Sequence, residues 1–63
     1  MEYCDFSCKK IAEDYYLVFM DTYGCKEEVG GFTHGEIFIY PKYKGHSLGY
    51  VIRQFMEEVY GAP

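Results

Sequence analysis

The stretch DYYLVFMD, residues 14–21, alternates as a β-strand does and is apolar on both of its faces. In such a strand successive side chains point to opposite sides. One side carries Tyr15, Leu17 and Phe19, and the other carries Tyr16, Val18 and Met20. A strand of this kind needs cover on both faces, so the elements around it decide the fold.

Two further segments alternate in the same way. In EIFIY, residues 36–40, Ile37 and Ile39 oppose Phe38 and Tyr40, and Pro41 ends the strand because proline has no N–H to donate to a ladder. The segment EYCDFSCK, residues 2–9, reads as a half-buried edge strand with Cys4, Phe6 and Cys8 on one side. A short helix over residues 8–14 is the alternative there, because Lys, Ala and Glu are good helix formers.

The last element has helical periodicity. Apolar residues recur three and four positions apart at Leu48, Val51, Ile52, Phe55, Met56 and Val59. We expect a helix over residues 47–60, with Ser47 as its N-cap and Gly61 as its stop.

Together these elements predict an α+β fold in which residues 1–63 form a single small domain. The expected architecture is a three-stranded antiparallel sheet in β-β-β-α order, with residues 14–21 as the central strand and the C-terminal amphipathic helix on one face. Residues 22–35 break the apolar pattern and are expected to form a long loop. As an alternative, this loop folds back over the uncovered face of the sheet.

The formal net charge is −4, from ten acidic and six basic side chains. This balance argues against binders of duplex DNA or membranes that depend on a basic face, and it favours a basic or neutral protein partner. No stretch approaches the roughly 20 apolar residues of a membrane span, and the N-terminus lacks a signal-peptide pattern. A cytoplasmic location is therefore expected.

Neither a metal site nor an enzyme is expected. Cys4, Cys8 and Cys25 cannot all pair within one chain, so three reduced thiols are the simplest state. With His34 and His46 they match no common zinc-ligand spacing. Nothing in the spacing selects Cys25 and a histidine as a nucleophile and base, so no catalytic residue and no cofactor are predicted.

The junction YPKYKGHSLGY, residues 40–50, carries a local resemblance. Over residues 37–58 the chain resembles the acyl-CoA pyrophosphate-loop motif of the GNAT acetyltransferases, with corresponding residues at Ile39, Pro41, Tyr43, Lys44, Gly45 and Gly49. In that family the backbone N–H groups of the loop and the positive end of a helix hold the pyrophosphate of acetyl-CoA. The resemblance implies an acyl-CoA or phosphate site formed by Lys44, Gly45, His46, Ser47 and Gly49.

The same region has the ingredients of a single-stranded nucleic-acid binder. It combines cations with rings, at Lys42, Lys44, Arg53, Tyr40, Tyr43 and Tyr50. The acidic total argues against this reading, so nucleic acid is not the expected partner.

The leading hypothesis is a non-enzymatic module that binds, inhibits or regulates another protein through an aromatic sheet face or a sheet edge. By analogy, small regulators encoded by phages and mobile elements are often of this kind. Because one helix covers one face, a homodimer is also expected. The predicted interaction residues are Tyr16, Val18, Met20, Phe38 and Tyr40; the alternative set is Tyr15, Leu17, Phe19, Ile37 and Ile39.

Overall fold

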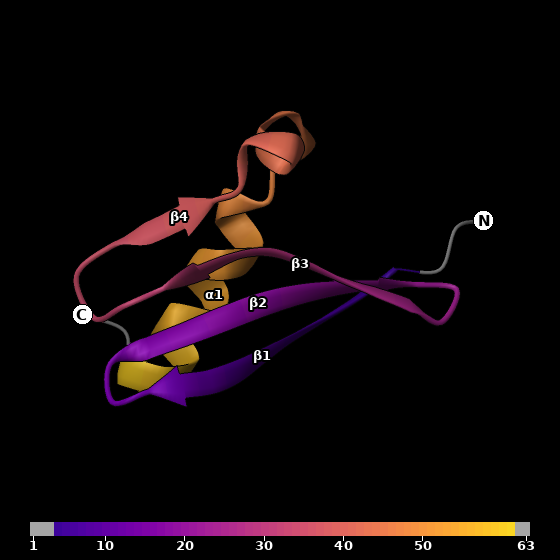
Figure 1. Cartoon of the computed structure of the whole chain (residues 1–63). Helices are drawn as coiled ribbons and strands as arrows, with labels where there is room; N and C mark the ends of the chain where they lie inside the picture. Colours follow the sequence, from indigo (N-terminus) through magenta and orange to yellow (C-terminus); the bar gives the residue numbers. More distant parts are fainter. Residues whose placement is uncertain (1–3, 62–63) are drawn as a thin grey trace.

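The computed structural model describes residues 4–61 and shows an antiparallel sheet followed by one helix (Figure 1). The elements are β1 (Asp5–Ala12), β2 (Tyr15–Thr22), β3 (Cys25–Phe32), β4 (Ile37–Ile39), a 3₁₀ helix η1 (Pro41–His46) and α1 (Gly49–Tyr60). The strands lie in the order β1-β2-β3-β4. The α+β class and the C-terminal helix are confirmed, but the expected number of three strands is wrong because the sheet has four.

The additional strand, β3, forms within the segment that was expected to be a loop. A two-residue turn joins it to β2, with left-handed φ values of 52° at Tyr23 and 84° at Gly24. Two successive left-handed residues match the twist of a hairpin, and glycine favours this conformation. The Asp21 carboxylate supports the turn by accepting a hydrogen bond of 3.0 Å from the Gly24 N–H.

Two adjacent glycines sit inside β3, where glycine is unusual. A Cβ atom at Gly30 would lie 2.3 Å from the Phe38 carbonyl oxygen and 3.1 Å from Cδ1 of Ile52. A Cβ atom at Gly31 would lie 2.4 Å from the Tyr16 carbonyl oxygen. Both glycines are buried, so close packing on the two faces of the sheet explains their presence.

The core lies between the sheet and α1, which runs behind the strands in Figure 1. α1 packs on β3 and β4. The pairing of β2 with β3 is interrupted by a bulge between Val18 and Phe19, which leaves Val29 without a partner on β2. The buried side chains are Val18, Val29, Phe32, Tyr43, Leu48 and Ile52.

The helix begins later than expected. Ser47 has a left-handed φ of 56° and links η1 to α1, and Leu48 occupies the N-cap without a side-chain hydrogen bond. The prediction of Ser47 as N-cap is therefore wrong, because this residue makes the turn between the two helices. The predicted stop is confirmed: Gly61 has a φ of 88°, and its N–H donates to the Glu57 carbonyl oxygen at 2.7 Å.

The N-terminal strand β1 forms where the alternation of apolar and polar residues predicts it. Phe6 and Cys8 pack against the core, and β1 continues to Ala12, so the alternative helix over residues 8–14 is wrong. Residues 2 and 3 of the predicted strand lie outside the described residues.

Candidate interaction surface

The side of the sheet that faces away from α1 carries a row of half-buried apolar side chains. We call it the open face, and its members are Tyr15, Leu17, Phe19, Phe38 and Tyr40. The rings of Tyr15 and Phe38 lie 5.7 Å apart, and those of Phe38 and Tyr40 are stacked at 6.1 Å. Tyr40 also packs against the core, whereas the other four side chains lie outside the core contacts.

The register of the sheet brings this row together. Leu17 on β2 is opposite Gly31 on β3, which is opposite Phe38 on β4. Because Gly31 has no side chain, the Phe38 ring occupies the space there: a Cβ atom at Gly31 would lie 2.7 Å from Phe38 Cζ. The aromatic row therefore crosses from β2 to β4 without a gap over β3.

Charged residues flank the row. On the neighbouring strands, Lys9 is opposite Leu17 and Glu28 is opposite Phe19. The Tyr40 hydroxyl donates a hydrogen bond to the Glu28 carboxylate. This bond, together with desolvation and the charge of Glu28, raises the pKa of Tyr40 to about 12 and keeps the phenol protonated.

The predicted interaction residues Tyr16, Val18, Met20, Phe38 and Tyr40 do not share one face. The first three lie on the side covered by α1, where Val18 is fully buried. The reason is the strand register. Val18 and Ile39 are both opposite Gly30 and lie on the helix side, whereas Leu17 and Phe38 are both opposite Gly31 and lie on the open face. Sequence alternation defines two faces for each strand, but it does not say which faces coincide.

The predicted phosphate-loop residues lie between β4 and α1. Lys44, Gly45 and His46 belong to η1, Ser47 follows it, and Gly49 begins α1. All are exposed except Gly49, which is half-buried near Ile39. Lys44 also lines a shallow hollow with β4. Acyl-CoA or phosphate binding at this loop stays a prediction.

The predicted basic and aromatic patch is only partly on the surface. Tyr43 is buried, and its hydroxyl donates to the Glu27 carboxylate, which raises the pKa of Tyr43 together with burial. The Lys42 ammonium lies 5.4 Å from the centre of the Tyr43 ring. Tyr50 is 70% exposed on α1. Nucleic-acid binding by this patch also stays a prediction.

The three thiols are free. Cys4 and Cys25 are exposed, and Cys8 is half-buried. Burial and the nearby charge of Glu58 raise the pKa of Cys8. Within residues 4–61, no cluster of three His, Cys, Asp or Glu side chains has the arrangement of a metal site.

One polar cluster was not anticipated from the sequence. Asp14, in the turn between β1 and β2, accepts hydrogen bonds from the Tyr60 hydroxyl and, at 3.0 Å, from the His34 N–H. The His34 ring meets the Tyr60 ring edge-on at 4.9 Å. These residues are up to 46 positions apart, so local sequence carried no signal of the contact. The cluster ties the end of α1 to two turns of the sheet.

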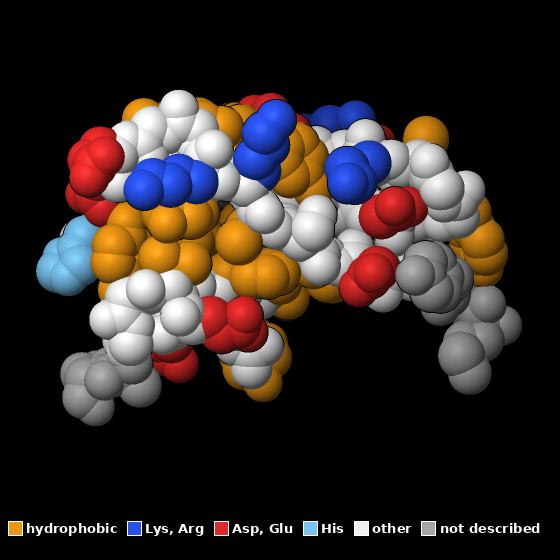
Figure 2. All heavy atoms as spheres, turned by 90° about the horizontal axis from the view of Figure 1, so that it is seen from below, with side chains coloured by type: hydrophobic (Ala, Val, Ile, Leu, Met, Phe, Trp, Pro, Cys, Tyr) orange, Lys and Arg blue, Asp and Glu red, His pale blue; other side chains and the backbone are white. Residues whose placement is uncertain are grey.

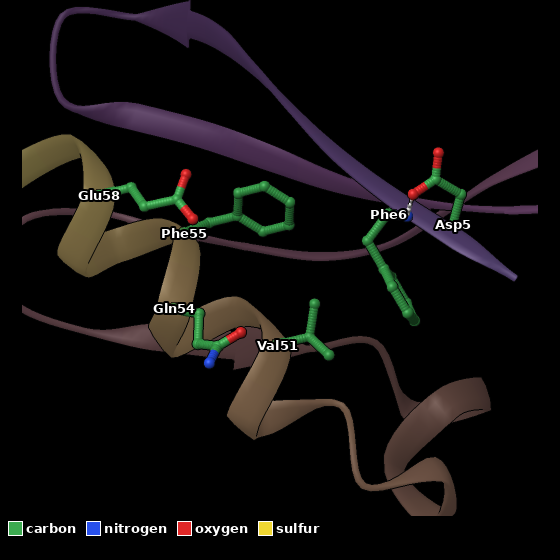
Figure 3. Close-up of a pocket in the computed structure, with 6 residues that line it drawn as sticks. All are labelled: Asp5, Phe6, Val51, Gln54, Phe55 and Glu58. Carbon is green, nitrogen blue, oxygen red and sulfur yellow. Dashed lines mark hydrogen bonds between the residues drawn. The ribbon is translucent and has the colours of Figure 1, made fainter.

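A second feature missed from the sequence is a hollow between β1 and α1, with a volume of about 170 Å³ (Figure 3). Phe6 points from β1 towards the helix, and Val51 and Phe55 lie across from it. The remaining lining residues are Asp5, Gln54 and Glu58. Figure 2 views the molecule from below relative to Figure 1, which is the side of β1. It shows hydrophobic side chains at the surface in the middle of the molecule.

No helix within residues 4–61 has the length and apolar character needed to cross a membrane. No protein-family model, curated protein or solved structure matches this chain.

Proposed function

We propose that this protein is a protein-interaction module that binds another protein through the open face. The observation that carries the proposal is that α1 covers one side of the sheet, whereas an unbroken aromatic row occupies the other side. Clustered apolar side chains on the surface of a small domain are typical of protein-binding sites. Tyrosines such as Tyr15 and Tyr40 also supply large contact area with few rotatable bonds, as interface hot spots do.

The charges around the open face support a partner with mixed polarity. Lys9 on β1 and Glu28 on β3 lie on the two strands that border β2, and Lys26 on β3 is opposite Asp21 at the end of the row. Such a border fits a protein surface with an apolar centre and charges of both signs at its rim. The net charge of −4 favours a partner that is neutral or basic overall.

A protein fits this surface better than a nucleic acid. Stacking rings alone resemble a single-strand platform, but such platforms also need cations that follow the phosphates. Here Glu28 holds Tyr40 and is the direct neighbour of Phe19, which places negative charge beside the rings. A polyanion would be repelled at that point.

The proposal can be tested by site-specific photo-crosslinking in the cells that naturally make the protein. A benzophenone amino acid replaces Phe19 on the open face and, as a matched control, Tyr50 on the outer side of α1. The expected result is that one protein is captured from position 19 and not from position 50. Purified partner should then bind the Phe19→Glu variant at least about tenfold more weakly than the wild type, because a charge is buried in an apolar contact.

Three results would contradict the proposal. One is the same set of products from positions 19 and 50, which indicates random collisions. Another is capture of RNA or DNA from position 19, which supports the nucleic-acid alternative. The third is capture of a second copy of the chain alone, which means that the open face is used for self-association.

A further inference from the structure

The outer edge of β1 is the longer free edge of the sheet. β1 has eight residues and pairs only with β2, whereas β4, the opposite edge strand, has three residues and ends two positions before Pro41. Within residues 4–61, nothing pairs with the outer side of β1. A long free edge exposes unpaired backbone donors and acceptors and accepts another strand readily.

The side chains of β1 make this edge complementary to itself. Asp5, Ser7 and Lys9 point to the open side of the sheet, because they are opposite Asp21, Phe19 and Leu17. When two copies of β1 pair antiparallel around a twofold axis at Ser7, Asp5 of each copy lies opposite Lys9 of the other. Phe6 then lies opposite Cys8 of the other copy on the helix side.

Other registers lose this match. A shift by two residues places Asp5 opposite either Ser7 or Ile11, so the two opposite charges no longer face each other. A shift by one residue turns the apolar side of one strand towards the open side of the other. Opposite charges directly across an antiparallel pair are favourable, and like charges are not.

One backbone N–H group at this edge already donates a hydrogen bond to a side chain. The Phe6 N–H donates a hydrogen bond of 2.9 Å to Oδ1 of Asp5. In the paired state the Asp5 carboxylate can turn to Lys9 of the second copy, which frees the Phe6 N–H for the ladder. Lys9 at the same time disfavours pairing with edges that have no acid at the matching position.

The hollow between β1 and α1 lies beside this edge and supports the same arrangement. α1 packs on β3 and β4, and the hollow separates Phe6 on β1 from Val51 and Phe55 on the helix (Figure 3). A twofold axis that pairs β1 with its copy places both helices on the same side of the joined sheet. The apolar walls of the two hollows then lie next to each other across the new strand pair.

From these observations we infer that the chain forms a twofold dimer in which two β1 strands pair antiparallel, with Asp5 of each copy opposite Lys9 of the other. The dimer has one continuous eight-stranded sheet, twice the four strands of one chain. This inference goes beyond the proposed function, because it uses the β1 edge and leaves the open face of both copies available to another protein.

Charge reversal at the two positions tests the register directly. The variants Asp5→Lys and Lys9→Asp each place like charges opposite each other twice, so each should raise the dissociation constant of the dimer at least about tenfold in sedimentation equilibrium. Both positions are exposed, so the folded chain should tolerate the changes. The matched control is Lys26→Glu, an exposed charge reversal on β3, which should leave the dissociation constant unchanged.

Mixing the two variants gives the decisive result. An Asp5→Lys chain and a Lys9→Asp chain restore both opposite-charge contacts when they pair, so an equimolar mixture should form a heterodimer as tight as the wild-type dimer. The double exchange Asp5→Lys with Lys9→Asp should restore the homodimer. Circular dichroism of each single variant at a concentration where it is monomeric confirms that it is folded.

The inference is overturned if the wild-type chain is monomeric at millimolar concentration, if single reversals leave the dimer intact, or if the variants fail to recombine. A dimer that Phe19→Glu dissociates and the charge reversals do not would place the contact on the open face, which also overturns it. Loss of the dimer in the Asp5→Lys variant with unchanged crosslinking from position 19 would separate this inference from the proposed function.

Discussion

The Phe38 ring lies over Gly31, filling the place where any other residue would put its side chain: a Cβ atom at Gly31 would come within 2.7 Å of Phe38 Cζ. The same atom would lie 2.4 Å from the Tyr16 carbonyl oxygen on the other neighbouring strand. The pair joins β3 and β4 and supports the aromatic row of the open face. Its geometry therefore links stability to the shape of the proposed binding surface.

We expect Gly31→Ala to destabilise the protein by about 1–3 kcal/mol, because the added methyl group forces a backbone shift and displaces the Phe38 ring. Urea unfolding followed by circular dichroism measures this loss. The control is Gly45→Ala, since a Cβ atom there has no atom within 4 Å. Equal stability of the two variants would show that the sheet adapts to a side chain at position 31.

The contact between α1 and the sheet depends on Ile52, which is fully buried above Gly30. We expect Ile52→Ala to lower the free energy of unfolding by about 2–5 kcal/mol, because it leaves a cavity in the small core. The matched control on the same helix is Tyr50→Ala, where the side chain is 70% exposed and the change should stay within about 0.5 kcal/mol. If both substitutions cost the same, α1 is not packed as described.

Stability at alkaline pH should depend on Tyr60. Its hydroxyl donates to Asp14, and this bond, with desolvation and the charge of Asp14, raises its pKa from 10.0 to about 12. Because the pKa is higher in the folded state, the stabilisation is fully present below pH 10 and is lost as the pH rises through about 12. Thermal melts across this window should show a steep fall in melting temperature for the wild type.

The Tyr60→Phe variant provides the comparison. Its melting temperature should be lower at neutral pH and should fall by less between pH 10 and 12, because the phenol with the raised pKa is absent. Tyr40, whose pKa is also raised to about 12, still contributes in this variant. Parallel pH curves for the wild type and Tyr60→Phe would contradict the contact with Asp14.

Thiol reactivity should distinguish Cys8 from the other two cysteines. Its pKa is raised by burial and by Glu58, and the thiolate is the reactive form, so iodoacetamide should modify Cys4 and Cys25 first and Cys8 more slowly. Mass spectrometry of the digested protein gives the rate at each site. Glu58→Gln should speed the reaction of Cys8 and leave Cys25 unaffected, whereas equal rates at all three sites would contradict the placement of Cys8.

The local sequence pattern was sufficient to predict the elements whose periodicity is strong. The alternation of residues 14–21 predicted β2, and the apolar stripe from Leu48 to Val59 predicted α1, because each period matches the repeat of one secondary structure. The sequence also indicated that α1 stops at Gly61 and that Pro41 cannot continue the last strand, although β4 already ends at Ile39, because both residues act on their own backbone. The α+β class follows from these elements alone.

Local sequence pattern does not predict β3. Glycine has a low preference for strands, so the sequence predicts a loop at Gly30 and Gly31, whereas the structure has both inside β3. Their reason for being in the sheet lies in other parts of the chain, with Ile52 and Phe38 filling the space above and below them. The turn at Tyr23 and Gly24 was the one local signal of a hairpin in this segment.

By itself, then, the sequence determined that residues 14–21 form a strand with two apolar faces, that an amphipathic helix ends the fold, and that the chain carries an excess of acid. Only the tertiary structure decided that Phe38 joins Leu17 on the open face, that Tyr60 reaches Asp14, and that β1 is left as the long free edge. The physical reason is that periodicity and turn preference act over a few neighbouring residues. Strand register and face sharing depend instead on contacts between distant residues, which form only when the whole sheet is packed against its helix.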